Sequence, residues 1–130
     1  MNESQLRTET RKFRRFRNLG DIAPYCRICG KFDWRYRYEY HHIAGRNYSS
    51  TVILICGDCH DWISDMQKDR PPLPPGIDPQ VAQLVHQLHG HIEINARSTE
   101  CLQRTISAVL GIVSPANDNG GATPNAEEMQ

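Results

Sequence analysis

The sequence has no long hydrophobic run. Hydrophobic residues make up 38% of its 130 residues, and no apolar stretch approaches the roughly 18 residues that a membrane-spanning helix needs. The N-terminus also lacks the apolar core of a secretory signal peptide. We therefore expect a soluble, cytoplasmic protein with no membrane partner. Such a low hydrophobic fraction favours a small metal-stapled core with polar appendages over a large apolar core.

The chain also has no net charge, because 15 Lys and Arg balance 15 Asp and Glu. The charge is nevertheless unevenly distributed. Residues 1–46 contain 11 basic and 5 acidic residues, whereas residues 47–130 contain 4 basic and 10 acidic ones. A basic first half indicates a polyanionic partner such as nucleic acid. The plainer alternative is a solvated charged surface.

Cysteine is scarce, but four of the five cysteines form a pattern. They occur as Cys26-Arg-Ile-Cys29 and Cys56-Gly-Asp-Cys59. Each turn of this type brings two thiolates to one ion, and two turns complete a tetrahedral four-sulfur site. A single pair would also fit a redox pair, but two pairs predict structural zinc in a reducing compartment. Cys101 is left over, and we expect it to be a small buried residue.

Composition divides the chain into five segments. We expect a basic N-terminal arm (1–20), a zinc domain (21–69), a proline-rich linker (70–78), a helical extension (79–113) and a disordered tail (114–130). The arm has the spacing of a basic amphipathic helix that stops at a glycine. We favour an arm that lies along a nucleic-acid backbone; the alternative is a tail that orders only on binding.

Inside the zinc domain, the pattern predicts two strands and a helix. Aromatic and charged residues alternate over residues 32–42, which predicts a strand whose aromatic face is most simply explained by core packing. Residues 51–55 are β-branched and apolar, and they predict the second strand. A helix over about residues 59–67 follows. The predicted fold class is α+β, with a ββα unit that carries zinc at its base.

The helical extension begins with Asp78-Pro79, a helix N-cap followed by proline in the first turn. Gly90 and the polar stretch 95–99 leave open one kinked helix or two. The extension has an apolar stripe, which we expect to pack on the domain; the alternatives are pairing with a second chain or docking to a larger protein. The stripe consists of Val81, Leu84, Val85, Leu88, Ile92, Leu102, Ile106, Val109 and Val113.

Three histidines accompany the cysteine pairs. His41 and His42 end the first predicted strand and His60 begins the helix, so a ββα fold can bring His41 and His60 together. Two imidazoles with open coordination positions can hold a divalent cation that polarises a phosphoryl oxygen. A third can take a proton from water at neutral pH, and the Arg46 guanidinium can hold a phosphate. For each histidine, a structural hydrogen bond is the alternative.

These residues resemble the HNH (ββα-metal) nuclease family, in its four-cysteine subclass. The resemblance covers residues 25–66, through Cys-x-x-Cys, Glu-x-His-His-Ile-x-Gly-Arg and Leu-Ile-Cys-x-x-Cys-His. It implies that His41 and His60 hold a catalytic divalent cation (Mg²⁺, Mn²⁺ or similar) and that His42 is the general base. The implied activity is hydrolysis of DNA phosphodiester bonds leaving a 5′-phosphate, by a bacterial or phage-encoded protein.

One position departs from the family pattern. Thr51 stands where the family has its middle asparagine. Asn47, or the hydroxyls of Ser49 and Ser50, would then have to fix the loop and orient His42.

Two geometric questions remain. One helical turn after His60 stands Ser64, a poor ligand, so Asp61, Asp65 or water must complete the metal shell. In addition, adjacent residues of a regular strand point to opposite faces, so two neighbouring histidines can serve one site only where the strand distorts or ends.

A nuclease of this kind needs a DNA-binding surface. The candidates are basic residues of the arm, the first strand and the following loop, namely Arg14, Arg15, Arg35, Arg37 and Arg46. Two other functions fit the sequence. One is a non-catalytic zinc module that binds nucleic acid or protein, and the other is an assembly component whose helical extension docks a larger machine.

Overall fold

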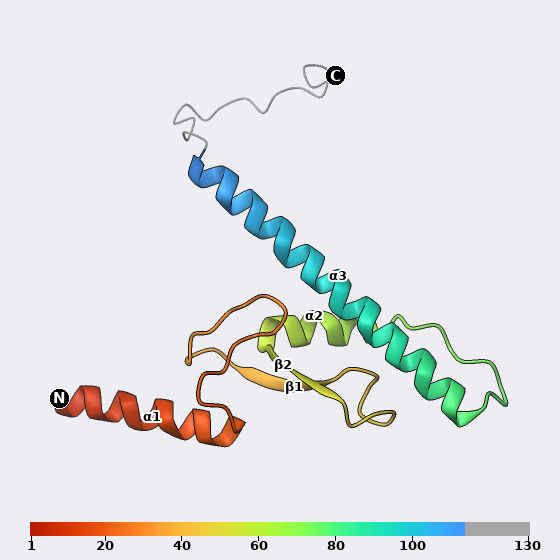
Figure 1. The fold of residues 1–130 in the computed structure, drawn as a ribbon, viewed down its shortest axis with the longest axis horizontal. Helices are drawn as coiled ribbons and strands as arrows, with labels where there is room; N and C mark the ends of the chain where they lie inside the picture. The colour runs from red at the N-terminus through yellow and green to blue at the C-terminus, as the bar shows by residue number, and fades with distance from the viewer. Residues whose placement is uncertain (114–130) are drawn as a thin grey trace, which may run out of the picture.

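The computed structural model describes residues 1–113. In chain order the elements are α1 (Glu3–Leu19), β1 (Tyr38–His42), β2 (Val52–Cys56), α2 (Gly57–Gln67) and α3 (Pro79–Val113) (Figure 1). This order confirms the α+β class. The predicted disordered tail, 114–130, lies outside the described residues. Within residues 1–113, no helix combines the length and apolarity needed to cross a bilayer.

The N-terminal arm forms the predicted helix. Asn2 caps α1 by accepting a hydrogen bond from the Gln5 backbone N–H, and the Gln5 side chain accepts one from the Asn2 N–H in return. The helix ends at Gly20, whose φ of 70° is the left-handed conformation that glycine adopts without strain. No residue of α1 is buried. The helix projects away from the hairpin and is attached near its C-terminal end, where the Tyr40 hydroxyl donates to the Leu19 carbonyl at 2.6 Å.

The two strands form an antiparallel hairpin whose register runs from Tyr38 opposite Cys56 to His42 opposite Val52. The prediction that the first strand begins at residue 32 was wrong, because β1 begins six residues later. Asp33 explains the difference: its side chain accepts the Arg35 N–H at 3.0 Å, and its carbonyl accepts the Tyr36 N–H at 3.1 Å. These bonds fold residues 33–36 into a turn, and a turn cannot continue a strand ladder.

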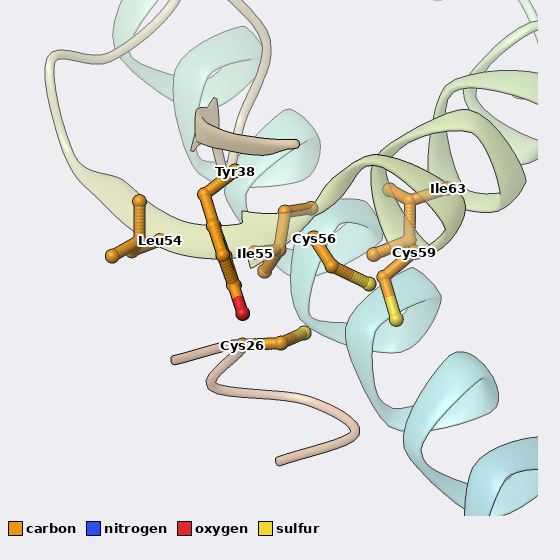
Figure 2. Close-up of a cluster of buried hydrophobic side chains, with 7 residues drawn as sticks. All are labelled: Cys26, Tyr38, Leu54, Ile55, Cys56, Cys59 and Ile63. Carbon is orange, nitrogen blue, oxygen red and sulfur yellow. The ribbon is translucent and has the colours of Figure 1, made fainter. Parts of the chain in front are cut away.

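The hydrophobic core and the cysteine cluster are one structure. Figure 2 shows Tyr38, Leu54, Ile55 and Ile63 around three of the cysteines. The Tyr38 hydroxyl donates to the Lys31 and Asp33 carbonyls at 3.1 and 2.9 Å, which fixes the first cysteine loop beneath the hairpin. Because the cysteines fill the small interior, metal binding and core packing depend on each other.

The helical extension is one continuous helix of 35 residues, which settles the question of one helix or two. Its first half packs against α2, and its second half runs past the domain (Figure 1). Gly90 lies at the closest approach: a Cβ atom there would stand 1.9 Å from the Ile43 carbonyl oxygen. Only glycine permits α3 to pass so close to the end of β1.

Candidate metal centres

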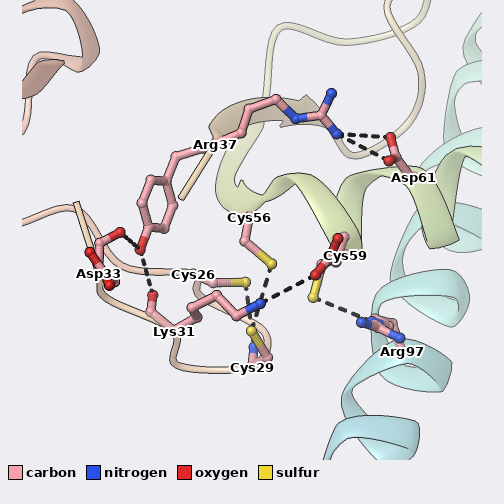
Figure 3. Close-up of polar contacts among 11 residues, drawn as sticks. Cys26, Cys29, Lys31, Asp33, Arg37, Cys56, Cys59, Asp61 and Arg97 are labelled. Atoms are coloured by element: carbon pink, nitrogen blue, oxygen red, sulfur yellow. Dashed lines mark hydrogen bonds and ion pairs between the residues drawn. The ribbon is translucent and has the colours of Figure 1, made fainter. Parts of the chain in front are cut away.

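The four predicted zinc ligands converge. The Sγ atoms of Cys26, Cys29, Cys56 and Cys59 all lie within 4.8 Å of one another. Cys29 and Cys56 are 3.7 Å apart, and a zinc tetrahedron with Zn–S bonds of about 2.3 Å has edges of roughly 3.8 Å. The first loop supplies two sulfurs, the end of β2 the third, and the first turn of α2 the fourth (Figure 3). This group could hold one structural zinc ion.

The surroundings of the cluster suit a bound cation. The Cys29 backbone N–H donates to Cys26 Sγ at 3.4 Å, and burial raises the pKa of the Cys29 thiol to about 11. Four thiolates cannot stay ionised together in this buried position without a positive charge to compensate them. A bound zinc ion would supply that charge and replace the four protons.

Arg97, which the sequence analysis missed, belongs to this centre. It is 6% exposed, and its Nε donates to Cys59 Sγ at 3.3 Å (Figure 3). Its guanidinium also lies 5.5 Å from the centre of the Trp62 ring. A hydrogen-bond donor of this kind orients a thiolate and offsets the excess negative charge of a four-sulfur zinc site. Arg97 therefore ties α3 to the metal centre.

The structure also brings His41 and His60 together. Their ring centroids are 5.5 Å apart, with the planes at 83°. His41 is only 3% exposed, and burial, followed by the nearby His60, lowers its pKa to about 4. A histidine with this pKa is neutral at pH 7, so one ring nitrogen keeps the lone pair that a metal ligand needs.

Neighbouring side chains orient the two rings. Glu39 Oε2 is buried, lies 3.1 Å from His60 Nδ1 and has no hydrogen-bond partner within residues 1–113. A proton on Nδ1 turned towards this carboxylate would leave Nε2 of His60 free. The Gln67 amide nitrogen is 3.4 Å from His41 Nε2, and an amide N–H can only donate, so this contact uses the lone pair of Nε2, and Gln67 would have to turn away before a cation could bind there.

Within residues 1–113, no third side chain completes this pair. Among the described residues, the cysteine cluster is the only group of three or more His, Cys, Asp or Glu side chains with converging ligand atoms. Asp61 is held by Arg37 through two contacts of 3.1 Å, and Asp65 lies 4.0 Å from Lys68. Ser64 Oγ faces Nδ1 of His60 at 3.4 Å. Among the described residues, a cation at this place would have His41 and His60 as its protein ligands, with its remaining positions left to water or substrate.

His42 lies on the other face of the hairpin. The strand stays regular through His42, so His41 pairs with Ile53, His42 pairs with Val52, and the two side chains alternate. His42 is half-buried at the end of β1, where the chain turns and the Gly45 N–H donates to the His42 carbonyl at 3.1 Å. The structure therefore does not place His42 beside the histidine pair.

The loop after β1 borders a surface hollow of about 480 Å³. Arg46 and Asn47 are exposed at its rim, and Gln67, which contacts His41, lines it as well. The Thr51 N–H donates to the Ser49 hydroxyl at 3.0 Å, so this serine helps to fix the loop, as one of the predicted alternatives proposed.

A buried ion pair, which the sequence did not reveal, clamps this loop. Arg70 donates through Nε and Nη2 to the two carboxylate oxygens of Glu93, at 2.8 and 2.6 Å. The same guanidinium donates to the Ala44 carbonyl at 2.8 Å and lies 3.2 Å from His86 Nδ1. The clamp joins the end of β1, the linker and α3, and it holds the loop next to the histidines in one position.

The predicted DNA-binding arginines lie in different surroundings. Arg15 donates to the Trp34 and Arg35 carbonyls at 3.1 and 2.9 Å and so fastens α1 to the turn. The guanidiniums of Arg11, Arg15 and Arg35 all lie within 6.0 Å of the Trp34 ring centre, which gives a basic surface around an aromatic ring. Arg14 is exposed on α1.

Comparison of the chain with protein-family models, with curated proteins and with solved structures found no match.

Proposed function

We propose that this protein is a metal-dependent endonuclease of the HNH type that hydrolyses DNA phosphodiester bonds. The observation that carries the proposal is the His41–His60 pair, 5.5 Å apart beside a four-cysteine cluster on a ββα frame. The resemblance of residues 25–66 to that family supports the same assignment. Neither the cysteine cluster nor the fold would suggest a nuclease without these histidines.

Each residue has a distinct role in this proposal. His60 would hold a divalent cation through Nε2, with its Nδ1 facing Glu39, and His41 would hold it through Nε2 once the Gln67 amide turns away from that nitrogen. The bound cation would polarise a phosphoryl oxygen and stabilise the leaving oxygen. His42 would accept a proton from the attacking water. Since His42 faces away from the pair, the substrate phosphate must lie across the end of β1.

The rim of the hollow suits a phosphate backbone. Arg46 is exposed there and offers a guanidinium fork to a phosphate. Farther away, the arginines around Trp34 and the exposed Arg14 extend the positive surface along α1. Contacts of this kind position DNA without reading its sequence, so we propose weak sequence specificity.

The test is plasmid cleavage by the purified, zinc-loaded protein with Mg²⁺, Mn²⁺ or Ni²⁺, against an EDTA control. We expect nicking or linearisation that His42→Ala and His60→Ala both abolish while each variant keeps its zinc and its helical content. The matched control is His91→Ala, which removes an exposed histidine of α3 that contacts Gln87. Equal cleavage by wild type and both site variants would contradict the proposal.

A second candidate is a non-catalytic zinc module that binds nucleic acid. Among the residues that the structure describes, His41 and His60 have no third protein ligand beside them, which favours this candidate, together with Thr51 at the family's asparagine position. DNA binding that weakens steeply with salt, without cleavage under any cation, would support this candidate over the nuclease.

A further inference from the structure

The face of α3 that points away from the domain carries an apolar stripe. We call it the outer stripe; its apolar members are Val81, Val85, Leu88, Ile92, Leu102, Ile106 and Val109. Leu88, Ile92 and Leu102 are 54%, 59% and 62% exposed. With the polar Asn95 and Thr99 included, consecutive positions are separated by four and three residues in strict alternation. That spacing averages 3.5 residues, the period of a coiled-coil seam.

The opposite face of α3 is already occupied. Ala82, Gly90, Glu93 and Arg97 are buried there; Gly90 lies against Ile43, Glu93 binds Arg70, and Arg97 donates to Cys59. One side of the helix therefore serves the domain, and the other side has no partner within residues 1–113. Because α3 is rigid and packed on its inner face, the outer stripe cannot turn inward.

The residues that flank the outer stripe favour a second copy of this chain as its occupant. The positions on either side of the seam hold no Asp, Glu, Lys or Arg; they are Leu84, His89, His91, Ala96, Ser98, Gln103, Thr105 and Leu110. Two copies would thus meet without like-charge repulsion, and an oppositely charged partner would gain nothing from these positions. The nearby Glu100 and Arg104 pair with each other at 3.0 Å, away from the seam.

The stripe is also symmetric. Apolar positions lie at equal distances before and after its two polar members, Asn95 and Thr99. In a parallel pair, each polar residue would face its own counterpart; in an antiparallel pair, Asn95 would face Thr99. Either orientation buries apolar residues against apolar residues and keeps the polar ones together.

The expected contact area is modest. From Val81 to Val109 the helix is about 42 Å long and roughly 11 Å wide, so two helices would bury on the order of 900 Å² in total. This area is near the lower limit of specific interfaces, so we expect a weak dimer that dissociates on dilution.

We propose that the protein forms a homodimer in which the outer stripes of two α3 helices pair as a two-stranded coiled coil. The domains lie on the outer sides of the two helices, so they do not obstruct the contact. The dimer does not depend on nuclease activity.

The test is the molar mass of the full-length, zinc-loaded protein by sedimentation velocity and light scattering, from about 1 to about 100 µM. We expect a concentration-dependent dimer. The variant Leu102→Asp with Ile106→Asp, placed where α3 has left the domain, should weaken dimerisation by at least about 100-fold. The matched control is Ser107→Asp with Ala108→Asp, which adds two carboxylates to the same exposed segment outside the stripe and should remain dimeric.

All three proteins should keep their zinc content, so that a change in mass reflects the interface. A wild-type protein that stays monomeric over this range would overturn the proposal and leave the stripe to a different macromolecule. A Leu102→Asp, Ile106→Asp variant that dimerises as well as wild type would overturn it too, because the contact would lie elsewhere.

Discussion

Two sets of candidate metal-ligating side chains share one ββα unit, and they differ in completeness. The four cysteine sulfurs converge within 4.8 Å, and three of the four residues are buried in the core. His41 and His60 form a pair with no third protein ligand in the described part of the chain. A complete, buried set can only hold an ion in place, whereas an incomplete set leaves positions where substrate can bind. The cysteines thus serve the fold, and the histidines are where chemistry is feasible.

Helix α3 supports both sets from one side. Arg97 contacts the cysteine cluster, Glu93 clamps the loop after β1 through Arg70, and Gly90 passes beneath Ile43. The comparison can therefore be tested by changes that should affect one set and spare the other.

The largest effect is expected at the cysteine cluster. Cys59→Ser removes one of four sulfurs from a site that also forms the core, so zinc binding and cooperative unfolding should be lost together. Metal analysis and thermal unfolding by circular dichroism would measure both. Cys101→Ser is the control, since Cys101 lies outside the cluster and should leave zinc content unchanged. A Cys59→Ser protein that unfolds like wild type would contradict a structural role for the cluster.

Glu93→Gln should have the next largest effect on stability, because it breaks the ion pair that holds the loop next to the histidines. The Arg70–Glu93 pair is only 10% and 4% exposed, and leaving Arg70 unpaired should lower the free energy of unfolding by about 3 to 5 kcal/mol. Urea unfolding would measure it, with zinc content expected to stay at the wild-type value. Glu100→Gln, which breaks the largely exposed pair with Arg104, should cost less than about 1 kcal/mol.

A double variant sharpens this result. Arg70→Met with Glu93→Leu replaces both charges with apolar groups and should recover much of the lost stability. If the double variant were as unstable as Glu93→Gln, the cost would come from the lost loop contacts of Arg70 rather than from an unpaired charge.

Acidification should lower the free energy of unfolding because His41 is buried as a neutral ring. Because its pKa is lowered to about 4 in the folded protein, the unfolded chain binds more protons below about pH 6.5. The burial of the neutral His41 ring therefore does not change the free energy of unfolding above that pH. It lowers this free energy as the pH falls towards 4, by up to about 3 kcal/mol. The measurement is the free energy of unfolding between pH 7.5 and 5 for wild type and His41→Gln. The variant should have the shallower slope; parallel slopes would refute the assignment, because cysteine protonation affects both proteins equally.

The smallest effect is expected where α3 passes close to Ile43 at Gly90. Gly90→Ala places a Cβ atom against the Ile43 carbonyl and should cost about 1 to 3 kcal/mol. Gly111→Ala, where nothing lies within 4 Å, should instead raise the free energy of unfolding by roughly 0.5 kcal/mol. Nuclear magnetic resonance shifts of the histidine rings should change in Gly90→Ala and not in Gly111→Ala.

The parts of the molecule that sequence predicts well depend on local spacing. The Cys-x-x-Cys turns, the Gly20 stop of α1 and the second strand follow from residues close together in the chain, and the structure confirms them. The convergence of His41 and His60 followed from the predicted ββα order, and their rings do lie together. The roles of these histidines in catalysis stay predictions.

The features that sequence did not predict depend on distant partners or on competing local bonds. Arg97 lies 38 residues from Cys59, and Glu93 lies 23 from Arg70, so no short motif joins them. The first strand was predicted too long because alternation continues through residues 32–37, while the Asp33 carboxylate captures a backbone amide and turns the chain. An alternating sequence shows only which side chains would share a face of a strand. It does not show whether the backbone amides are free to form hydrogen bonds with a neighbouring strand.

The positions of Gly90, Glu93 and Arg97 limit how this chain can change length. They are separated by three and four residues, so they share one face of α3 and reach three separate anchor points in the domain. A single inserted residue between Gly90 and Arg97 would rotate one anchor by roughly 100° relative to the other. Insertions or deletions should therefore be excluded between residues 90 and 97, whereas beyond residue 101 they would leave these anchors in place and shift only the later part of the outer stripe.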